Sequence, residues 1–168
     1  MPIDERETSW NASIIADFRA HAGAITSGPL AGSNLLLMTS VGARSGQPHV
    51  APLGYTRDGE RYVVVGSNSG RPQNPEWLRN IQSDPLVTVD VGTASFRAMA
   101  SITTGSERRR LLDAHIAAIP IFARYEVDGR ARAAGRDPGT GPVGGSAQVR
   151  RPDPTPDPGG TRAAAAAG

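Results

Sequence analysis

The chain has 168 residues, long enough for one domain with a substantial core, and its formal net charge is only +2. So small a charge does not favour nucleic-acid binding. Cysteine is absent, which excludes disulfides and thiolate metal sites, and the three histidines lack the spacing of metal ligands. The chain has neither a signal-peptide pattern nor an apolar run of about 18 residues, so we expect a cytoplasmic protein.

The first part of the chain predicts one helix and three strands. Apolar residues at helical spacing indicate a helix over 11–22. Residues 34–40 form a continuous apolar run, which is typical of a strand buried on both faces. Residues 49–56 and 61–67 then predict a hairpin around the Asp-Gly turn at 58–59.

The next part predicts two helices and two more strands. Residues 74–83 indicate a short helix, and 86–91 and 95–103 alternate like half-buried strands. Thr104 and Glu107 have the spacing of a capping box at the start of a last helix. Five successive antiparallel strands with flanking helices predict a small, mainly β fold, closed or nearly closed into a barrel that protects its edges.

The C-terminal segment has the composition of a disordered tail. It contains no aromatic residue, and its only large aliphatic residues are Val127, Val143 and Val149. Such a sequence buries too little apolar surface to offset the entropy that ordering costs. We therefore predict a folded domain over 1–126 and a disordered tail over 127–168.

Two loops rich in small polar residues favour a ligand site. Gly42 and Gly46 flank Arg44 and Ser45, so the backbone can approach an anion closely while the guanidinium and hydroxyl groups donate hydrogen bonds. An ordinary glycine-rich turn with an exposed arginine is the alternative, and this loop alone favours it. The second loop, at 67–70, adds hydroxyl and amide groups at the end of the next strand. If the strands pair as predicted, both loops lie near one groove.

Further residues are candidates for the walls of that groove. Pro52 donates no hydrogen bond within its strand, and Gly54 leaves space for a planar ring to lie on the strand. From the predicted short helix, Asn74, Trp77 and Asn80 are also candidates to close the groove, Trp77 by stacking. A core position for this tryptophan is the more common arrangement, so both interpretations stay open.

A family resemblance is carried by several motifs together. The segments GPLAGSNLLLMTSVGARSGQP, APLGY, DGERYVVVGSNSG, NPEWLRNIQSDPLVTVDVG and FARYE occur in this order within residues 11–126. They resemble the deazaflavin-dependent nitroreductase family of actinobacteria, whose members reduce quinones and nitroaromatics with reduced coenzyme F420. The resemblance implies a split β-barrel, with the cofactor's phosphate and acidic tail at Arg44 and its ring system along the second and third strands.

The resemblance also implies a set of site residues. The family's loop has two basic positions, of which the first is Ala43 here and the second is Arg44. Phe122 and Tyr125 fall in the implied substrate pocket. No catalytic side chain and no metal is implied, because the cofactor carries the chemistry. The implied cofactor-binding residues are Arg44, Ser45, His49, Val50, Ala51, Pro52, Leu53, Gly54, Val65, Gly66, Ser67, Asn68, Glu76, Trp77, Leu78, Arg79 and Asn80.

The C-terminal part departs from the family pattern. Family members continue past the last helix into an apolar strand that completes the sheet, and no such run follows Ile121. We therefore expect the last strand to be missing, as in a frameshifted or replaced C-terminus.

The leading functional hypothesis is hydride transfer from reduced F420 to a quinone, a nitroaromatic or a similar electron-poor small molecule. The alternative is a non-catalytic or vestigial barrel, because a missing strand leaves an unpaired sheet edge. An FMN-binding barrel is less favoured, since only the family resemblance separates the two anionic cofactors. We expect no nucleic-acid partner and no transmembrane segment, and we leave oligomeric state and peripheral membrane contact open.

Overall fold

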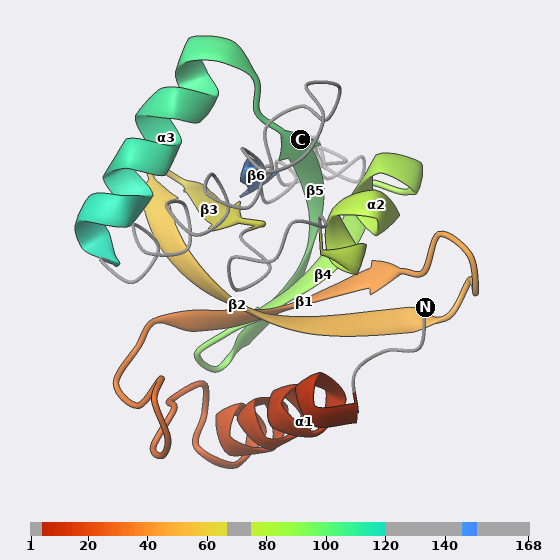
Figure 1. Ribbon diagram of the computed structural model, residues 1–168, viewed down its shortest axis with the longest axis vertical. Coiled ribbons are helices and arrows are strands. Elements are labelled where there is room, and N and C mark those ends of the chain that lie inside the picture. Colours follow the sequence, from red (N-terminus) through yellow and green to blue (C-terminus); the bar gives the residue numbers. More distant parts are fainter. Residues whose placement is uncertain (1–4, 67–74, 120–145, 151–168) are drawn as a thin grey trace, which may run out of the picture.

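The computed structural model describes residues 5–66, 75–119 and 146–150. In these residues, six antiparallel strands close into a barrel in the order β1-β2-β3-β6-β5-β4 (Figure 1). The strands are β1 (Leu35–Val41), β2 (Pro48–Asp58), β3 (Arg61–Val65), β4 (Leu86–Val91), β5 (Ala94–Ile102) and β6 (Ser146–Arg150), and the helices are α1 (Glu5–Ala20), α2 (Glu76–Ser83) and α3 (Gly105–Ala118). The predicted fold class, mainly β with flanking helices, is confirmed.

Strand β1 is buried on both faces, as its continuous apolar run predicted. Leu36 and Met38 belong to the core inside the barrel, whereas Leu35 and Leu37 pack on the opposite face with Phe18 of α1. Each fully buried side chain of this size stabilises the fold by about 1.5–3 kcal/mol. The two sets alternate along the strand because successive side chains point to opposite faces of a sheet. Helix α1 thus covers the outside of β1 and β2 (Figure 1).

The expectation that the last strand is missing is wrong. Residues Ser146–Arg150 form β6, which pairs antiparallel with β3 on one side and β5 on the other. Val149 is 0% exposed within the barrel core. Composition misses this strand because it has only five residues and is held mainly by backbone hydrogen bonds to a strand on each side. Its described contribution to the apolar core is one valine, Val149. The predicted disorder of 127–145 and 151–168 concerns residues outside the described part of the chain.

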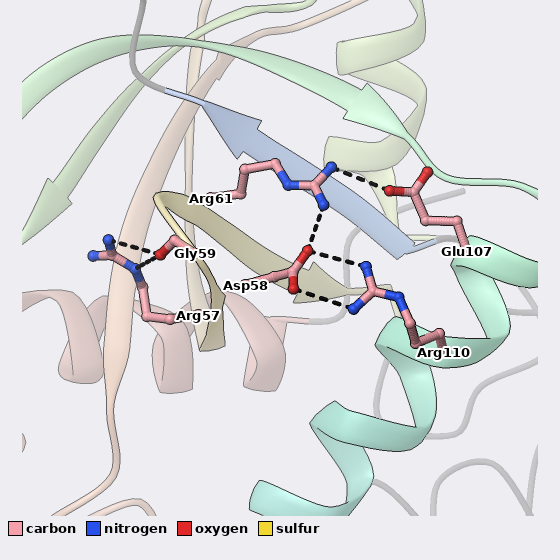
Figure 2. Close-up of polar contacts among 6 residues, drawn as sticks. All are labelled: Arg57, Asp58, Gly59, Arg61, Glu107 and Arg110. Carbon is pink, nitrogen blue, oxygen red and sulfur yellow. Dashed lines mark hydrogen bonds and ion pairs between the residues drawn. The ribbon is translucent and has the colours of Figure 1, made fainter.

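Helix α3 is attached to the β2–β3 hairpin by a network of ion pairs (Figure 2). Arg110 donates two hydrogen bonds of 3.1 Å to the carboxylate of Asp58, which also pairs with Arg61. Arg61 in turn reaches Glu107 Oε1 at 3.1 Å. The hydrogen bonds from Arg110 and then from Arg61 lower the pKa of Asp58 below its ordinary value. This network fixes the hairpin turn against the first turns of α3.

A buried histidine provides a second link between α3 and the barrel. His115 is 0% exposed, and its Nδ1 lies 3.0 Å from Thr56 Oγ1 on β2. Burial lowers the pKa of His115 to about 4, because the charged imidazolium loses its hydration there. The imidazole is therefore neutral at pH 7.

None of the helices in the described residues combines the length and the apolar character that a membrane span needs.

Candidate functional site

The β1–β2 connection, residues 42–47, is a loop folded on itself. The Gly42 N–H donates to Gln47 O at 2.8 Å, and the Gly46 N–H donates to Gly42 O at 2.8 Å. The Gln47 N–H donates to Ser45 Oγ at 3.2 Å. These hydrogen bonds give the loop a defined shape without any ligand.

Each glycine of this loop has a structural reason, and the reason is stronger for Gly46 than for Gly42. A Cβ atom at Gly42 would lie 2.4 Å from Ser45 Oγ and 3.2 Å from Gln47 O. Gly46 has a φ of +67°, a left-handed conformation that favours glycine. The turn itself therefore accounts for the glycines, but it does not account for the arginine between them.

Arg44 is the cation that this loop presents. Its side chain is exposed, and it forms no ion pair with any residue in the described ranges. Arg61 and Arg110, by contrast, are neutralised by acidic partners. A guanidinium with no acidic partner, on a loop with a fixed shape, is suited to bind a phosphate or carboxylate group.

Helix α2 holds the loop from one side. Asn80 Oδ1 accepts a hydrogen bond from the Ala43 N–H at 2.9 Å, and Asn80 Nδ2 donates to Ser40 Oγ at 3.1 Å. Asn80 and Ser40 are each 1% exposed. The structure therefore brings together two segments that the sequence placed in the site, the Arg44 loop and α2 (Figure 1).

The predicted segment 49–54 does not present one face to a ligand. Ala51 and Leu53 belong to the barrel core, whereas Val50 packs with the α1 cluster on the other face. Gly54 pairs with Leu35, which faces α1, and directly paired residues share a face of the sheet. Any space above Gly54 therefore lies on the α1 side of β2. A planar ring placed there would lie on the opposite face of the sheet from Ala51 and Leu53.

His49 lies on the same face as Ser40, with which it pairs across the sheet. The His49 Nδ1 atom is shielded from solvent and has no hydrogen-bond partner in the described part of the chain. A buried polar atom without a partner is unfavourable, and it is a reason to look for a ligand atom nearby. His49 and the buried Asn80 amide thus lie at the same end of the barrel as Arg44.

The remaining predicted residues divide by burial. Trp77 and Leu78 are 4% and 3% exposed and belong to the barrel core, which supports the core interpretation of Trp77. Glu76 and Arg79 are exposed on the same helix. Val65 and Gly66 are buried at the end of β3, and Pro52 is half-buried within β2. Ser67, Asn68, Asn74, Phe122 and Tyr125 lie outside the described residues.

Sequence reasoning missed one participant in this arrangement, Ser40. It is one of two polar residues in β1, with Thr39, and a buried polar residue at the end of the apolar run was the available signal. The sequence also gave no indication that the amide of Asn80 is used within the protein, because burial depends on how α2 packs against β1. Its pairing with the Ala43 N–H joins positions 37 residues apart in the chain.

The fold and the basic loop define a split β-barrel of the deazaflavin-dependent reductase type. A solved F420-H2 dependent reductase (FDR-A) matches this chain with a TM-score of 0.58 and 25% sequence identity, over 70% of this chain and 94% of the other. The chain belongs to the F420H(2)-dependent quinone reductase family, whose model matches residues 12–131. The family resemblance noted in the sequence is thereby confirmed.

Two mycobacterial relatives show how far the similarity extends. An F420H(2)-dependent quinone reductase of Mycobacterium tuberculosis is 40% identical over 65 residues, which cover 39% of this chain and 44% of the relative. A second M. tuberculosis protein of the same family name is 34% identical over 76 residues, covering 45% of this chain and 64% of the relative. The matched stretch thus spans less than half of the first relative's length.

Proposed function

We propose that this protein transfers a hydride from reduced coenzyme F420 to a quinone. Membership of the F420H(2)-dependent quinone reductase family supports the reaction class. The observation that carries the proposal is Arg44, an exposed guanidinium with no acidic partner in the described residues, on a loop whose shape is set by its own hydrogen bonds. Such a loop suits a cofactor with a phosphate and an acidic tail.

The residues present fit this group. Arg44 would hold the anionic part of the cofactor, and the Ser45 hydroxyl, which accepts from Gln47, retains its own proton to donate. His49 offers a shielded Nδ1 atom without a partner in the described part of the chain. When bound, the cofactor supplies the hydride, and the chain supplies binding and orientation.

The protein's own contribution is a packed barrel that carries the loop. The barrel core is apolar, with Met38, Ala51 and Val89 at 0–5% exposure. In this proposal the chain orients the cofactor, and no side chain acts as a nucleophile.

The vestigial-barrel alternative loses its main support. It rested on an unpaired sheet edge, and β6 pairs with both β3 and β5. FMN as the cofactor is a matter for direct measurement, because a phosphate would satisfy the same arginine. The cytoplasmic location stays a prediction. Peripheral membrane contact stays a prediction as well, and sedimentation with anionic lipid vesicles would test it.

The test is a titration of the purified protein with F420, FMN and NADPH, followed by fluorescence. Arg44→Ala should weaken F420 binding by about 1.5–3 kcal/mol, the range for hydrogen bonds to charged groups, which is about a tenfold to hundredfold rise in Kd. Arg19→Ala is the matched control, since Arg19 is exposed in the last turn of α1, the helix that packs on the outer face of β1. Reduction of a soluble quinone such as menadione by F420H2 then measures the activity.

Unchanged affinity in Arg44→Ala would remove this residue from the site. A chain that binds FMN but not F420 would overturn the cofactor assignment. Binding of F420 without quinone reduction would support the non-catalytic alternative.

A further inference from the structure

The side chain of Asn80 joins three elements at one end of the barrel. Its Nδ2 donates to Ser40 Oγ on β1 at 3.1 Å, and its Oδ1 accepts from the Ala43 N–H at 2.9 Å. At 1% exposure, the amide is removed from solvent. A ligand in contact with the surface of α2 therefore meets the exposed Glu76 and Arg79 rather than Asn80.

Packing alone does not call for an asparagine at this position. The other buried residues of α2 are Trp77, Leu78 and Ile81, all apolar. A buried amide is unfavourable unless it is hydrogen-bonded, and a leucine of similar shape would fill the same space. The polar group is therefore explained by the two polar atoms that it meets, the Ser40 hydroxyl and the Ala43 N–H.

The bond to Ala43 fixes the backbone one residue before Arg44. In the described part of the chain, the other hydrogen bonds of residues 43–46 stay within the loop itself. Those internal bonds set the shape of the loop. The β1–β2 ladder holds the two ends of the loop, and the Asn80 amide is the further contact that ties its backbone to α2.

We propose that Asn80 is a positioning residue that holds the Arg44 loop in the orientation in which it receives the anionic part of the cofactor. This inference rests on the proposed F420 site. A loosened loop leaves a smaller fraction of molecules competent to bind, and the apparent Kd rises by the inverse of that fraction. Turnover at saturating cofactor stays near the wild-type value, because the bound complex is the same once formed.

The test compares Asn80→Leu with Gln82→Leu, an exchange of amide for leucine at an exposed position of the same helix. Asn80→Leu should raise the Kd for F420 about two- to tenfold, the effect of one lost hydrogen bond, with kcat at saturating F420 little changed. Gln82→Leu should leave both values unchanged. In an Arg44→Ala background, Asn80→Leu should add little, because the loop then has no guanidinium to orient.

A second measurement needs no cofactor. Hydrogen exchange at the Ala43 amide should be slow in the wild type and fast in Asn80→Leu, since this bond protects it. Ser40→Ala removes only the Nδ2 bond, so it should lower the melting temperature while the Ala43 amide stays protected. This variant separates general destabilisation from loss of positioning, and it serves if Asn80→Leu does not fold.

The outcomes distinguish the two proposals. Full additivity of Asn80→Leu and Arg44→Ala, or unchanged Kd and unchanged Ala43 exchange in Asn80→Leu, overturns the positioning role. Wild-type protein that binds no F420 overturns the proposed function instead. In that case the exchange result still decides whether Asn80 holds the loop.

Discussion

Closure of the barrel by β6 makes Val149→Ala a direct test of the fold. Val149 is 0% exposed and pairs with Tyr62 on β3 and Ala100 on β5. The substitution removes two buried carbon atoms at about 0.8 kcal/mol each, and the cavity left behind raises the total to about 2–3 kcal/mol. At roughly 4 °C per kcal/mol for a domain of this size, the melting temperature should fall by roughly 8–12 °C.

The assay is thermal unfolding followed by circular dichroism, with Val41→Ala as the control. Val41 is 40% exposed at the end of β1, so the same exchange there should cost less than about 1 kcal/mol. Equal shifts for the two variants would refute the reasoning, because they would return residues 146–150 to the structureless tail that composition predicts. A chain that ends at residue 145 should aggregate, since β3 and β5 lose the partner strand between them.

Two further predictions concern backbone packing and pH. Gly23→Ala should destabilise the fold clearly more than Gly28→Ala. Both residues have positive φ, but a Cβ at Gly23 would lie 2.5 Å from Gly92 Cα, whereas a Cβ at Gly28 meets nothing within 4 Å. Urea denaturation of the two variants therefore measures the cost of the close approach to Gly92. The folded pKa of His115, about 4, lies below the unfolded value of 6.5, so the unfolded state binds more protons between these values and the free energy of unfolding should fall by up to about 3 kcal/mol from pH 7 to pH 4. His115→Gln should reduce the dependence of the free energy of unfolding on pH in this range, and an unchanged dependence would assign it to other groups. The pKa of Asp58 is lowered, so its contribution to stability is lost at lower pH.

The sequence predicted the elements with strong periodicity and missed those that depend on context. The apolar run of β1 and the hairpin between β2 and β3 are local patterns, so they were predicted close to their observed positions. Helix α1 begins earlier than predicted, at Glu5, because its first turns lack the apolar spacing that marks a buried face. Strand β6 was missed because its stability comes from pairing with strands distant in the chain.

The candidate site was also predictable only in part, for the features that local sequence patterns show. A glycine-bracketed arginine is visible in the sequence, and the loop confirms that both glycines have structural reasons. The alternation of β2 is also visible in the sequence, whereas the family resemblance implies that all of segment 49–54 binds the cofactor. The register shows that neighbouring residues of that segment face opposite sides of the sheet. Burial of Asn80 follows from tertiary packing, which no local pattern reports.

Barrel closure and loop orientation depend on the same core. Trp77 and Leu78 of α2 belong to one apolar cluster with Val149 of β6, and α2 is the helix that carries Asn80. Because protein interiors are closely packed, a loss of order at β6 reaches α2 through side chains in this cluster. The C-terminal strand and the helix that contacts the Arg44 loop therefore share one core, although the strand and the loop lie far apart in the sequence. The Asn80 amide joins this core, through α2, to the backbone beside Arg44, so a contact of the loop depends on packing between segments distant in the sequence.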